Sequence, residues 1–251
     1  VPIPERALFL DEDGPEVISR IATYGGLTRE ILRVEEEPGE CTPYAILSNL
    51  IADEQHVYWA DETGLVRLSI YANVGDMPQL VNDEIVTASI HQPVELTDAG
   101  GDIYASVYNS DTSYTLWRVD KSTMDASPVL SRSGRIGSLS FDGEYLYWLD
   151  HTNNFDGLYR TAKTMSGYSH LPLGAEVTGY YAEGLRTLCI FGCTETHFVF
   201  IAHGNHVDRY NNLTGSTVDN IYVSDSAASD VIVYEMATDS SRLFILEQRP
   251  V

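Results

Sequence analysis

The sequence is poor in cysteine, in basic residues and in long apolar runs, and each shortage excludes a class of protein. Only three cysteines occur among the 251 residues, too few for a disulfide framework, and their spacing does not match a zinc site. We expect buried free thiols, with a bridge between Cys189 and Cys193 as the alternative. No apolar run approaches the roughly 18 residues that a membrane-spanning helix needs. The chain starts at Val1 without a basic and then apolar leader, so we expect a mature or excised product.

Acidic side chains outnumber basic ones more than twofold. Fifteen Lys and Arg residues stand against 37 Asp and Glu residues, which gives a formal net charge of −22. Such a field repels nucleic acid and anionic membrane surfaces, so we exclude both as partners and expect no membrane insertion. A basic partner surface, cations, or simple solubility outside the cell or at high salt remain compatible with the charge.

The strongest pattern in the sequence is an internal repeat. Short apolar segments, most of them aromatic, recur along the chain: Ala7–Asp11, Val57–Asp61, Ile103–Ser106, Leu146–Asp150, Phe198–Ala202 and Leu243–Glu247. When Phe9, Tyr58, Tyr104, Tyr147, Val199 and Phe244 are taken as equivalent, the successive spacings are 49, 46, 43, 52 and 45 residues. A period of this size is typical of one β-propeller blade.

A second feature shares this period. Each of the first five segments is followed by an apolar stretch that ends in arginine: Ile18–Arg20, Leu65–Arg67, Leu116–Arg118, Leu158–Arg160 and Val207–Arg209. Stretches that precede the repeat, such as Asn49–Asp53 and Val94–Asp98, end in Asp and small or polar residues, which favours hairpin turns. Stretches such as Pro78–Val81 and Pro128–Leu130 would supply a fourth strand.

The sequence therefore predicts an all-β chain with very little helix, folded as a β-propeller of four-stranded antiparallel blades. We expect residues 1–251 to form a single propeller domain of six, or alternatively five, blades. The first module lacks its leading strand and the last stops after its second. The ends therefore either complete each other and close the ring, or the chain is a portion of a larger one. A structural spacer within such a larger chain is a further possibility.

Two of the repeats resemble a known motif. Tyr58-Trp59-Ala60-Asp61 followed by Leu65-Val66-Arg67, and Tyr147-Trp148-Leu149-Asp150 followed by Leu158-Tyr159-Arg160, resemble the YWTD repeat of low-density-lipoprotein-receptor-type propellers and their bacterial relatives. The resemblance implies six blades, an extracellular or cell-envelope location and ligand binding by one face of the ring. The other repeats diverge from the motif, so the ligand is left open. We expect the aspartates and arginines to form hydrogen bonds between blades or along the blade rim.

One stretch carries residues that suit a divalent metal. His203, His206 and Asp208 place two imidazoles and a carboxylate within six residues, and both groups are common metal ligands. The stretch also fits an ordinary polar turn between the second and third strands of its module. Acidic turns such as Asp53-Glu54 and Asp61-Glu62 would suit Ca²⁺, although none has the spacing of an EF-hand loop. We expect no cofactor, with a divalent cation such as calcium as the alternative.

The sequence contains no linear catalytic motif. Gly-x-Ser-x-Gly, His-Glu-x-x-His and a glycine-rich phosphate loop are all missing. This favours a non-catalytic binding propeller that presents one face of its ring to a protein or glycan partner. The alternative is a propeller enzyme, a lyase or a lactonase-type hydrolase, because a site built around an axial metal or a His/Tyr pair leaves no linear motif.

Overall fold

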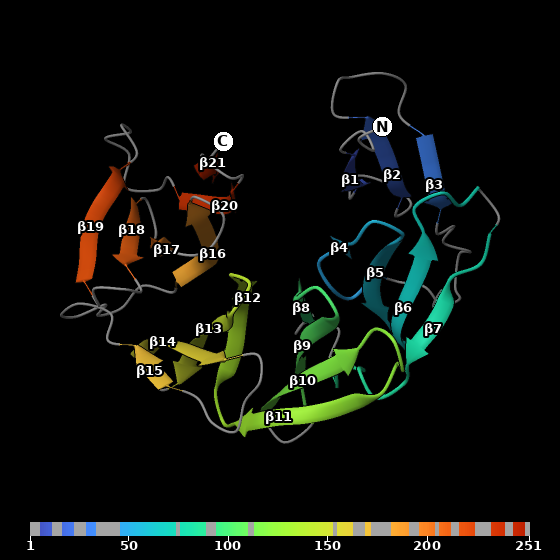
Figure 1. Ribbon diagram of the computed structural model, residues 1–251, viewed down its shortest axis with the longest axis horizontal. Helices are drawn as coiled ribbons and strands as arrows, with labels where there is room; N and C mark the ends of the chain where they lie inside the picture. The colour runs from blue at the N-terminus through green and yellow to red at the C-terminus, as the bar shows by residue number, and fades with distance from the viewer. Residues whose placement is uncertain are drawn as a thin grey trace. The chain divides into compact units, whose positions relative to one another are not determined.

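A computed structural model of the chain describes its fold in segments (Figure 1). The backbone is described for residues 6–11, 17–22, 29–33, 46–73, 76–88, 94–109, 113–152, 155–162, 169–171, 182–190, 196–203, 206–211, 216–223, 232–238 and 243–248. Side chains are described for residues 46–73, 76–88, 94–109, 113–150, 158–162, 199–201, 206–210, 221–223, 243 and 245. All statements below concern these residues.

Every regular element in the described segments is a β-strand, which confirms the all-β prediction. The strands are β1 Arg6–Asp11, β2 Val17–Ala22, β3 Arg29–Arg33, β4 Ile51–Ala52, β5 His56–Asp61, β6 Gly64–Ser69, β7 Gln79–Asn82, β8 Glu95–Asp98, β9 Asp102–Tyr108, β10 Tyr114–Asp120, β11 Ala126–Arg132, β12 Arg135–Phe141, β13 Tyr145–Thr152, β14 Phe155–Ala162, β15 Ser169–Leu171, β16 Ala182–Ile190, β17 Thr196–His203, β18 His206–Asn211, β19 Ser216–Val223, β20 Ile232–Thr238 and β21 Leu243–Gln248. The described residues contain no helix that is long and apolar enough to cross a membrane.

The strands form consecutive antiparallel sheets. Four-stranded sheets run in the orders β4-β5-β6-β7, β11-β10-β9-β8, β12-β13-β14-β15 and β16-β17-β18-β19. The first sheet has the three strands β1 to β3, and the last has the two strands β20 and β21. Within the described residues this matches the predicted modules, with three strands in the first sheet and two in the last.

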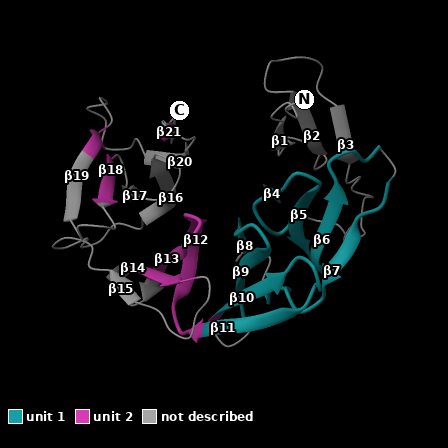
Figure 2. Ribbon diagram, in the orientation of Figure 1, with its two compact units in different colours: residues 1–111, 115–130 teal, residues 112–114, 131–251 magenta. Residues whose placement is uncertain are grey.

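The chain divides into two compact units (Figure 2). Unit 1 comprises residues 1–111 and 115–130, and unit 2 comprises residues 112–114 and 131–251. The sheets β1–β3, β4–β7 and β8–β11 therefore belong mainly to unit 1, with the division falling within β11. The sheets β12–β15, β16–β19 and β20–β21 belong to unit 2.

In unit 1, both faces of β5 are buried, as expected for a sheet packed between others. Tyr58 and Ala60 point into a core that they share with residues of the next sheet, such as Leu96 and Ile103. Their neighbours Val57 and Trp59 point to the opposite face and pack in a second cluster. Successive side chains of a strand point to opposite faces, so an apolar run without alternation buries both.

Unit 2 repeats this arrangement. Tyr147 and Leu149 of β13 pack in one core cluster with Val199 and Ile201 of β17, the second strand of the following sheet. The full burial of Trp148 shows that the other face of β13 is covered as well. Large apolar side chains of β5 and β13 thus hold their sheets against the sheets that follow in the same unit.

The strand pairing confirms the arginine-bearing third strand and corrects the alignment of the repeat at two positions. The cross-strand partners of Arg20, Arg67, Arg160 and Arg209 are Leu8, Tyr58, Tyr147 and Phe200, respectively. Phe9 and Val199, which the spacing selected as equivalents of Tyr58, are therefore out of register by one residue. A slip of one residue moves a side chain to the other face of the sheet. Both faces of these strands are apolar in sequence, so hydrophobicity alone does not fix the register.

Turns at the strand ends are formed by aspartate, as predicted. Asp53 accepts hydrogen bonds from the backbone N–H groups of Gln55 and His56, and Asp142 accepts the corresponding pair from Glu144 and Tyr145. Short acidic side chains favour such turns because they satisfy backbone donors locally.

Gly64 at the start of β6 has a backbone conformation that requires glycine. Its φ of +137° lies in a region that side chains rarely adopt, and a Cβ atom there would collide with the carbonyl oxygen of Asn82. Gly64 therefore fixes the close approach of β6 and β7 at this end of the sheet.

Candidate functional site

The predicted metal ligands lie on the β17–β18 hairpin. His203 and His206 are cross-strand partners at its turn, which brings their backbones together as the sequence suggested. Asp208 lies two residues beyond His206 and so points to the same face of the sheet. The side chain of His203 lies outside the described residues, so the three-ligand site remains a prediction. Among the described residues, no group of three or more His, Cys, Asp or Glu side chains is placed to hold a metal ion.

The register also relates His203 to the YWTD-like repeats. His203 follows Phe200 by three residues, as Asp61 follows Tyr58 and Asp150 follows Tyr147. A histidine thus stands at the repeat position that aspartate occupies in the two close repeats.

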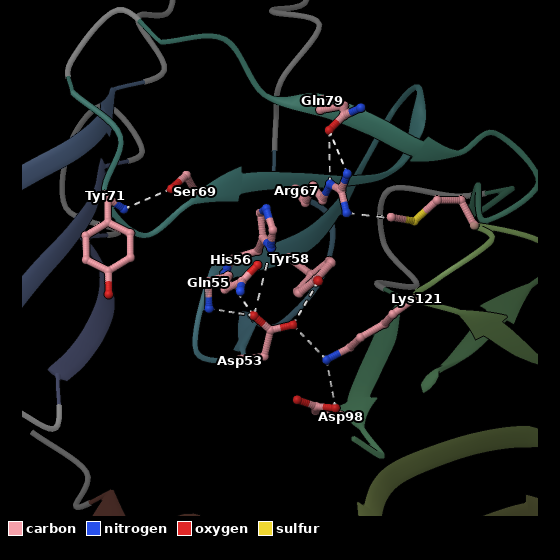
Figure 3. Close-up of polar contacts among 11 residues, drawn as sticks. Asp53, Gln55, His56, Tyr58, Arg67, Ser69, Tyr71, Gln79, Asp98 and Lys121 are labelled. Atoms are coloured by element: carbon pink, nitrogen blue, oxygen red, sulfur yellow. Dashed lines mark hydrogen bonds and ion pairs between the residues drawn. The ribbon is translucent and has the colours of Figure 1, made fainter. Parts of the chain in front are cut away.

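The densest polar cluster described lies in unit 1, where the sheets β4–β7 and β8–β11 meet (Figure 3). We call Asp53, His56, Tyr58, Asp98 and Lys121 the Asp53 cluster. They come from the turn after β4, from β5, from the end of β8 and from the turn after β10. In an antiparallel sheet the first and third turns lie at the same end, so these segments gather at one end of both sheets.

Asp53 is the centre of the cluster, and both of its carboxylate oxygens are engaged. Oδ1 accepts the backbone N–H groups of Gln55 and His56 at 2.8 and 2.9 Å. Oδ2 accepts the hydroxyl of Tyr58 at 2.9 Å and the ammonium group of Lys121 at 3.0 Å. Burial alone would raise the pKa of Asp53, but these four donors together lower it well below its ordinary value. The carboxylate is therefore ionised at any physiological pH.

Lys121 joins the two sheets. Its Nζ lies 3.0 Å from Asp53 Oδ2 and 3.0 Å from Asp98 Oδ1, and it stands 5.1 Å from the centre of the Tyr58 ring. Asn49 adds a second tie between the same sheets. Its amide nitrogen donates to the carbonyl of Leu96, and its amide oxygen accepts the N–H of Leu96.

His56 and Tyr58 are the titratable groups that chemistry at this cluster would use. Burial and the positive charges of Arg67 and Lys121 lower the pKa of His56, although Asp53 opposes the shift. The imidazole is therefore neutral at pH 7. Burial and the hydrogen bond to Asp53 raise the pKa of Tyr58, which keeps the phenol protonated. The two rings are tilted, with their centres 5.9 Å apart.

The cluster is built mainly to hold the sheets together. The carboxylate of Asp53 has its acceptor positions filled, and the ammonium group of Lys121 is held by two carboxylates. A group in that state is a poor nucleophile or base. Sequence reasoning treated Asp53 as a turn residue and a possible calcium ligand, and it missed Lys121. The feature of the sequence that could have drawn attention to Lys121 is that lysine is rare, with two in the chain.

Related polar contacts recur in the other repeats. In unit 2, Tyr147 donates to Asp142 at 2.9 Å, which repeats the pair formed by Tyr58 and Asp53 with the same spacing. In the sheet β8–β11, Arg118 instead binds Asp102, with both its Nε and one terminal nitrogen 3.0 Å from Oδ1. The contact with Asp102 confirms the expected hydrogen bonding for Arg118.

The two motif aspartates differ in their partners. Asp150 forms an ion pair with Arg132, the last residue of β11, with 3.6 Å between Oδ2 and Nε. Asp61 is almost fully buried, and its Oδ1 accepts two hydrogen bonds from Thr63. Its Oδ2 is buried without a hydrogen-bond partner among the described residues.

Comparisons with known proteins agree with this architecture. No family model and no curated protein matches the sequence, whereas 367 chains of solved structures match its fold. The chain is similar to a nidogen/laminin complex structure, with 14% identity, a TM-score of 0.59, and coverage of 88% of this chain and 76% of that one. It is similar to a calcium-binding protein, regucalcin, from Agrobacterium tumefaciens, with 13% identity, a TM-score of 0.58, and coverage of 96% and 77%. The fold is of the β-propeller type.

A third similar structure is the extracellular domain of BT4673 from B. thetaiotaomicron. It shows 14% identity and a TM-score of 0.58, and the match covers 97% of this chain but 31% of that one. At such identities the likeness concerns the fold alone.

Proposed function

We propose that this chain is a non-catalytic binding propeller that presents part of its acidic surface to a protein or glycan partner outside the cell or in the cell envelope. The observation that carries the proposal is the exposure of apolar side chains among residues 71–73 and 76–86 in unit 1. Large apolar side chains are exposed there in close sequence proximity: Tyr71, Met77, Leu80 and Val86. Asp76, Asp83 and Glu84 are exposed in the same stretch, and exposed apolar side chains that lie close together, as Met77 and Leu80 do in sequence, mark interaction sites.

The structural neighbours are compatible with such a role. One of them comes from a complex between proteins, and another is an extracellular domain. The net charge of −22 favours a partner with a basic surface, which long-range attraction would bring in rapidly at low ionic strength. Interactions between exposed charges are screened beyond about 10 Å at 0.1 M salt, so the association should slow as salt is added.

The test is reconstitution of a complex. The full chain is immobilised, partners are captured from an extract of the source organism, and each is then purified and titrated at low and high salt. A saturable complex whose association rate falls with salt supports the proposal. If no purified candidate, protein or glycan, gives saturable binding, the proposal fails.

A second candidate function is an enzyme, a lyase or a lactonase-type hydrolase. The observation in its favour is the neutral His56 beside the protonated Tyr58 at one end of the sheet. One similar structure is a calcium-binding protein, which makes calcium the cation to test. Metal analysis of the purified chain, with thermal unfolding before and after EDTA, addresses this candidate. The absence of both bound metal and an EDTA effect counts against a metal-dependent enzyme.

A further inference from the structure

Strand β7 is the last strand of its sheet, and its outer edge pairs with no strand in the described part of the chain. The order β4-β5-β6-β7 leaves β7 bonded to β6 alone, and Figure 1 shows it as the outermost arrow of that sheet. An edge strand presents unpaired N–H and C=O groups that can accept another strand.

Proteins usually protect such edges, and the neighbouring sheet shows how. Its outer strand β11 carries Pro128 in the middle, which removes a backbone donor. The exposed residues of β11 are the small or polar Ser127, Pro128 and Ser131. β7 has no proline between Gln79 and Asn82, and Pro78 stands only at its entrance.

The side chains around β7 are both apolar and acidic. We call residues 76–84 the β7 rim. Met77 is 67% exposed and Leu80 is 49% exposed, and Asp76, Asp83 and Glu84 are exposed beside them.

No lysine or arginine occurs within the β7 rim. The guanidinium group of Arg67, on the neighbouring strand β6, donates two hydrogen bonds to Oε1 of Gln79, at 2.9 and 3.0 Å. Gln79 is uncharged, so Arg67 keeps its positive charge, but Asp76, Asp83 and Glu84 outnumber it and leave net negative charge around the exposed apolar groups. That combination complements a segment that carries both positive charges and apolar side chains.

We propose that β7 accepts an extended segment of a partner protein as an additional antiparallel or parallel strand, and that this segment alternates basic and apolar residues. Main-chain hydrogen bonds along β7 provide the pairing, Met77 and Leu80 contact the apolar side chains, and Asp83 and Glu84 attract the basic ones. The inference rests on the proposed binding function and names its site and the chemistry of its partner. Because β7 is four residues long, the contact is small and the complex is of the transient kind.

The experiment uses the full chain and a fluorescent peptide of alternating lysine and valine, with a glutamate–valine peptide as the probe of opposite charge. Binding is measured by anisotropy, and hydrogen exchange with mass spectrometry locates the contact. We expect saturable binding of the lysine–valine peptide only, with slowed amide exchange in residues 79–82. Two variants change the rim: Leu80→Lys removes the exposed apolar contact, and Asp83→Lys with Glu84→Lys reverses its charge.

A matched control carries the same change of charge elsewhere. Glu54→Lys with Glu62→Lys alters two exposed acids of the same unit that lie outside the rim. We expect each rim variant to raise the Kd for the peptide about tenfold, equivalent to about 1.4 kcal/mol, and the control to change the Kd far less. Exchange of residues 57–60 in the unbound variants verifies that the sheet is intact.

The outcomes separate this proposal from the function on which it rests. Slowed amide exchange in β7, together with weaker peptide binding in the rim variants but not in the control, supports both the β7 site and the binding function. If the peptide or a reconstituted natural partner binds but protects other residues, or if the control variant weakens it equally, the β7 site is wrong and the binding function stands. If the peptide does not bind up to its solubility limit, the β7 proposal is overturned regardless of other partners.

Discussion

Replacement of Lys121 by methionine tests whether the Asp53 cluster holds the two sheets of unit 1 together. Methionine keeps most of the apolar stem and removes the ammonium group that binds Asp53 and Asp98. Because these residues come from different sheets, the loss acts on the junction between them and leaves the strand pairing within each sheet intact.

The size of the effect follows from burial. Lys121 is 12% exposed, whereas Asp53 and Asp98 are 26% and 27% exposed, so each pair is intermediate between an exposed and a buried one. Exposed pairs contribute up to about 1 kcal/mol, and loss of one partner of a fully buried pair costs about 3–5 kcal/mol. Both carboxylates keep other donors after the substitution, which limits the penalty. We therefore expect Lys121→Met to lower the free energy of unfolding by about 2 kcal/mol, including the lost contact with Tyr58.

Urea unfolding followed by tryptophan fluorescence is a suitable assay, because Trp59 and Trp117 both lie in unit 1. In a domain of this size a loss of about 2 kcal/mol corresponds to a fall in Tm of about 4–8 °C. Lys163→Met, at the only other lysine, makes the same change of charge. Asp98→Asn completes a double-mutant cycle, for which we expect a coupling of about 1 kcal/mol. If Lys121→Met is no less stable than Lys163→Met, or if the cycle shows no coupling, the reasoning is refuted.

Three further predictions concern other polar and backbone features. Asp150→Asn should lower the free energy of unfolding in urea by about 1–2 kcal/mol, because it removes the charge that pairs with Arg132. Asp61→Asn should lower it less, and equal losses for the two variants would show that Asp61 has a charged partner. Gly64→Ala should lower the free energy of unfolding by about 3 kcal/mol through its positive φ and the collision with Asn82, and an unchanged urea midpoint would contradict this. Burial and Asp142 raise the pKa of Tyr147 above its ordinary value of 10.0, so the unfolded chain releases this proton first and stability should fall as the pH rises above 10. The alkaline fall in unfolding free energy should be smaller in Tyr147→Phe, and parallel curves for the two proteins would refute the assignment.

The candidate site was only partly predictable from the sequence. The aspartate turns could be predicted, because Asp53 and Asp142 accept hydrogen bonds from residues only two or three positions away. The contact between Asp53 and Lys121 spans 68 positions, and no local rule relates two residues so far apart. The three residues chosen for a metal site share a hairpin, as expected, but their role as ligands is still a prediction.

The sequence by itself determined the strands and their repetition. Aromatic and apolar runs at a spacing near 45 residues, the first five of them followed by an arginine strand, specify sheets that are buried on both faces. These features are local, since turn chemistry and the burial of a strand depend on its own side chains.

Only the tertiary structure decided the register of the divergent repeats and the partners of the polar groups. Leu8 and Phe200, and not their apolar neighbours, are the cross-strand partners of the arginines, because hydrogen bonding to the adjacent strand sets the register where both faces are apolar. Packing of one sheet on the next brought Lys121 between two carboxylates. Among the described strands, none pairs with the outer edge of β7, whose apolar and acidic side chains define a testable binding surface.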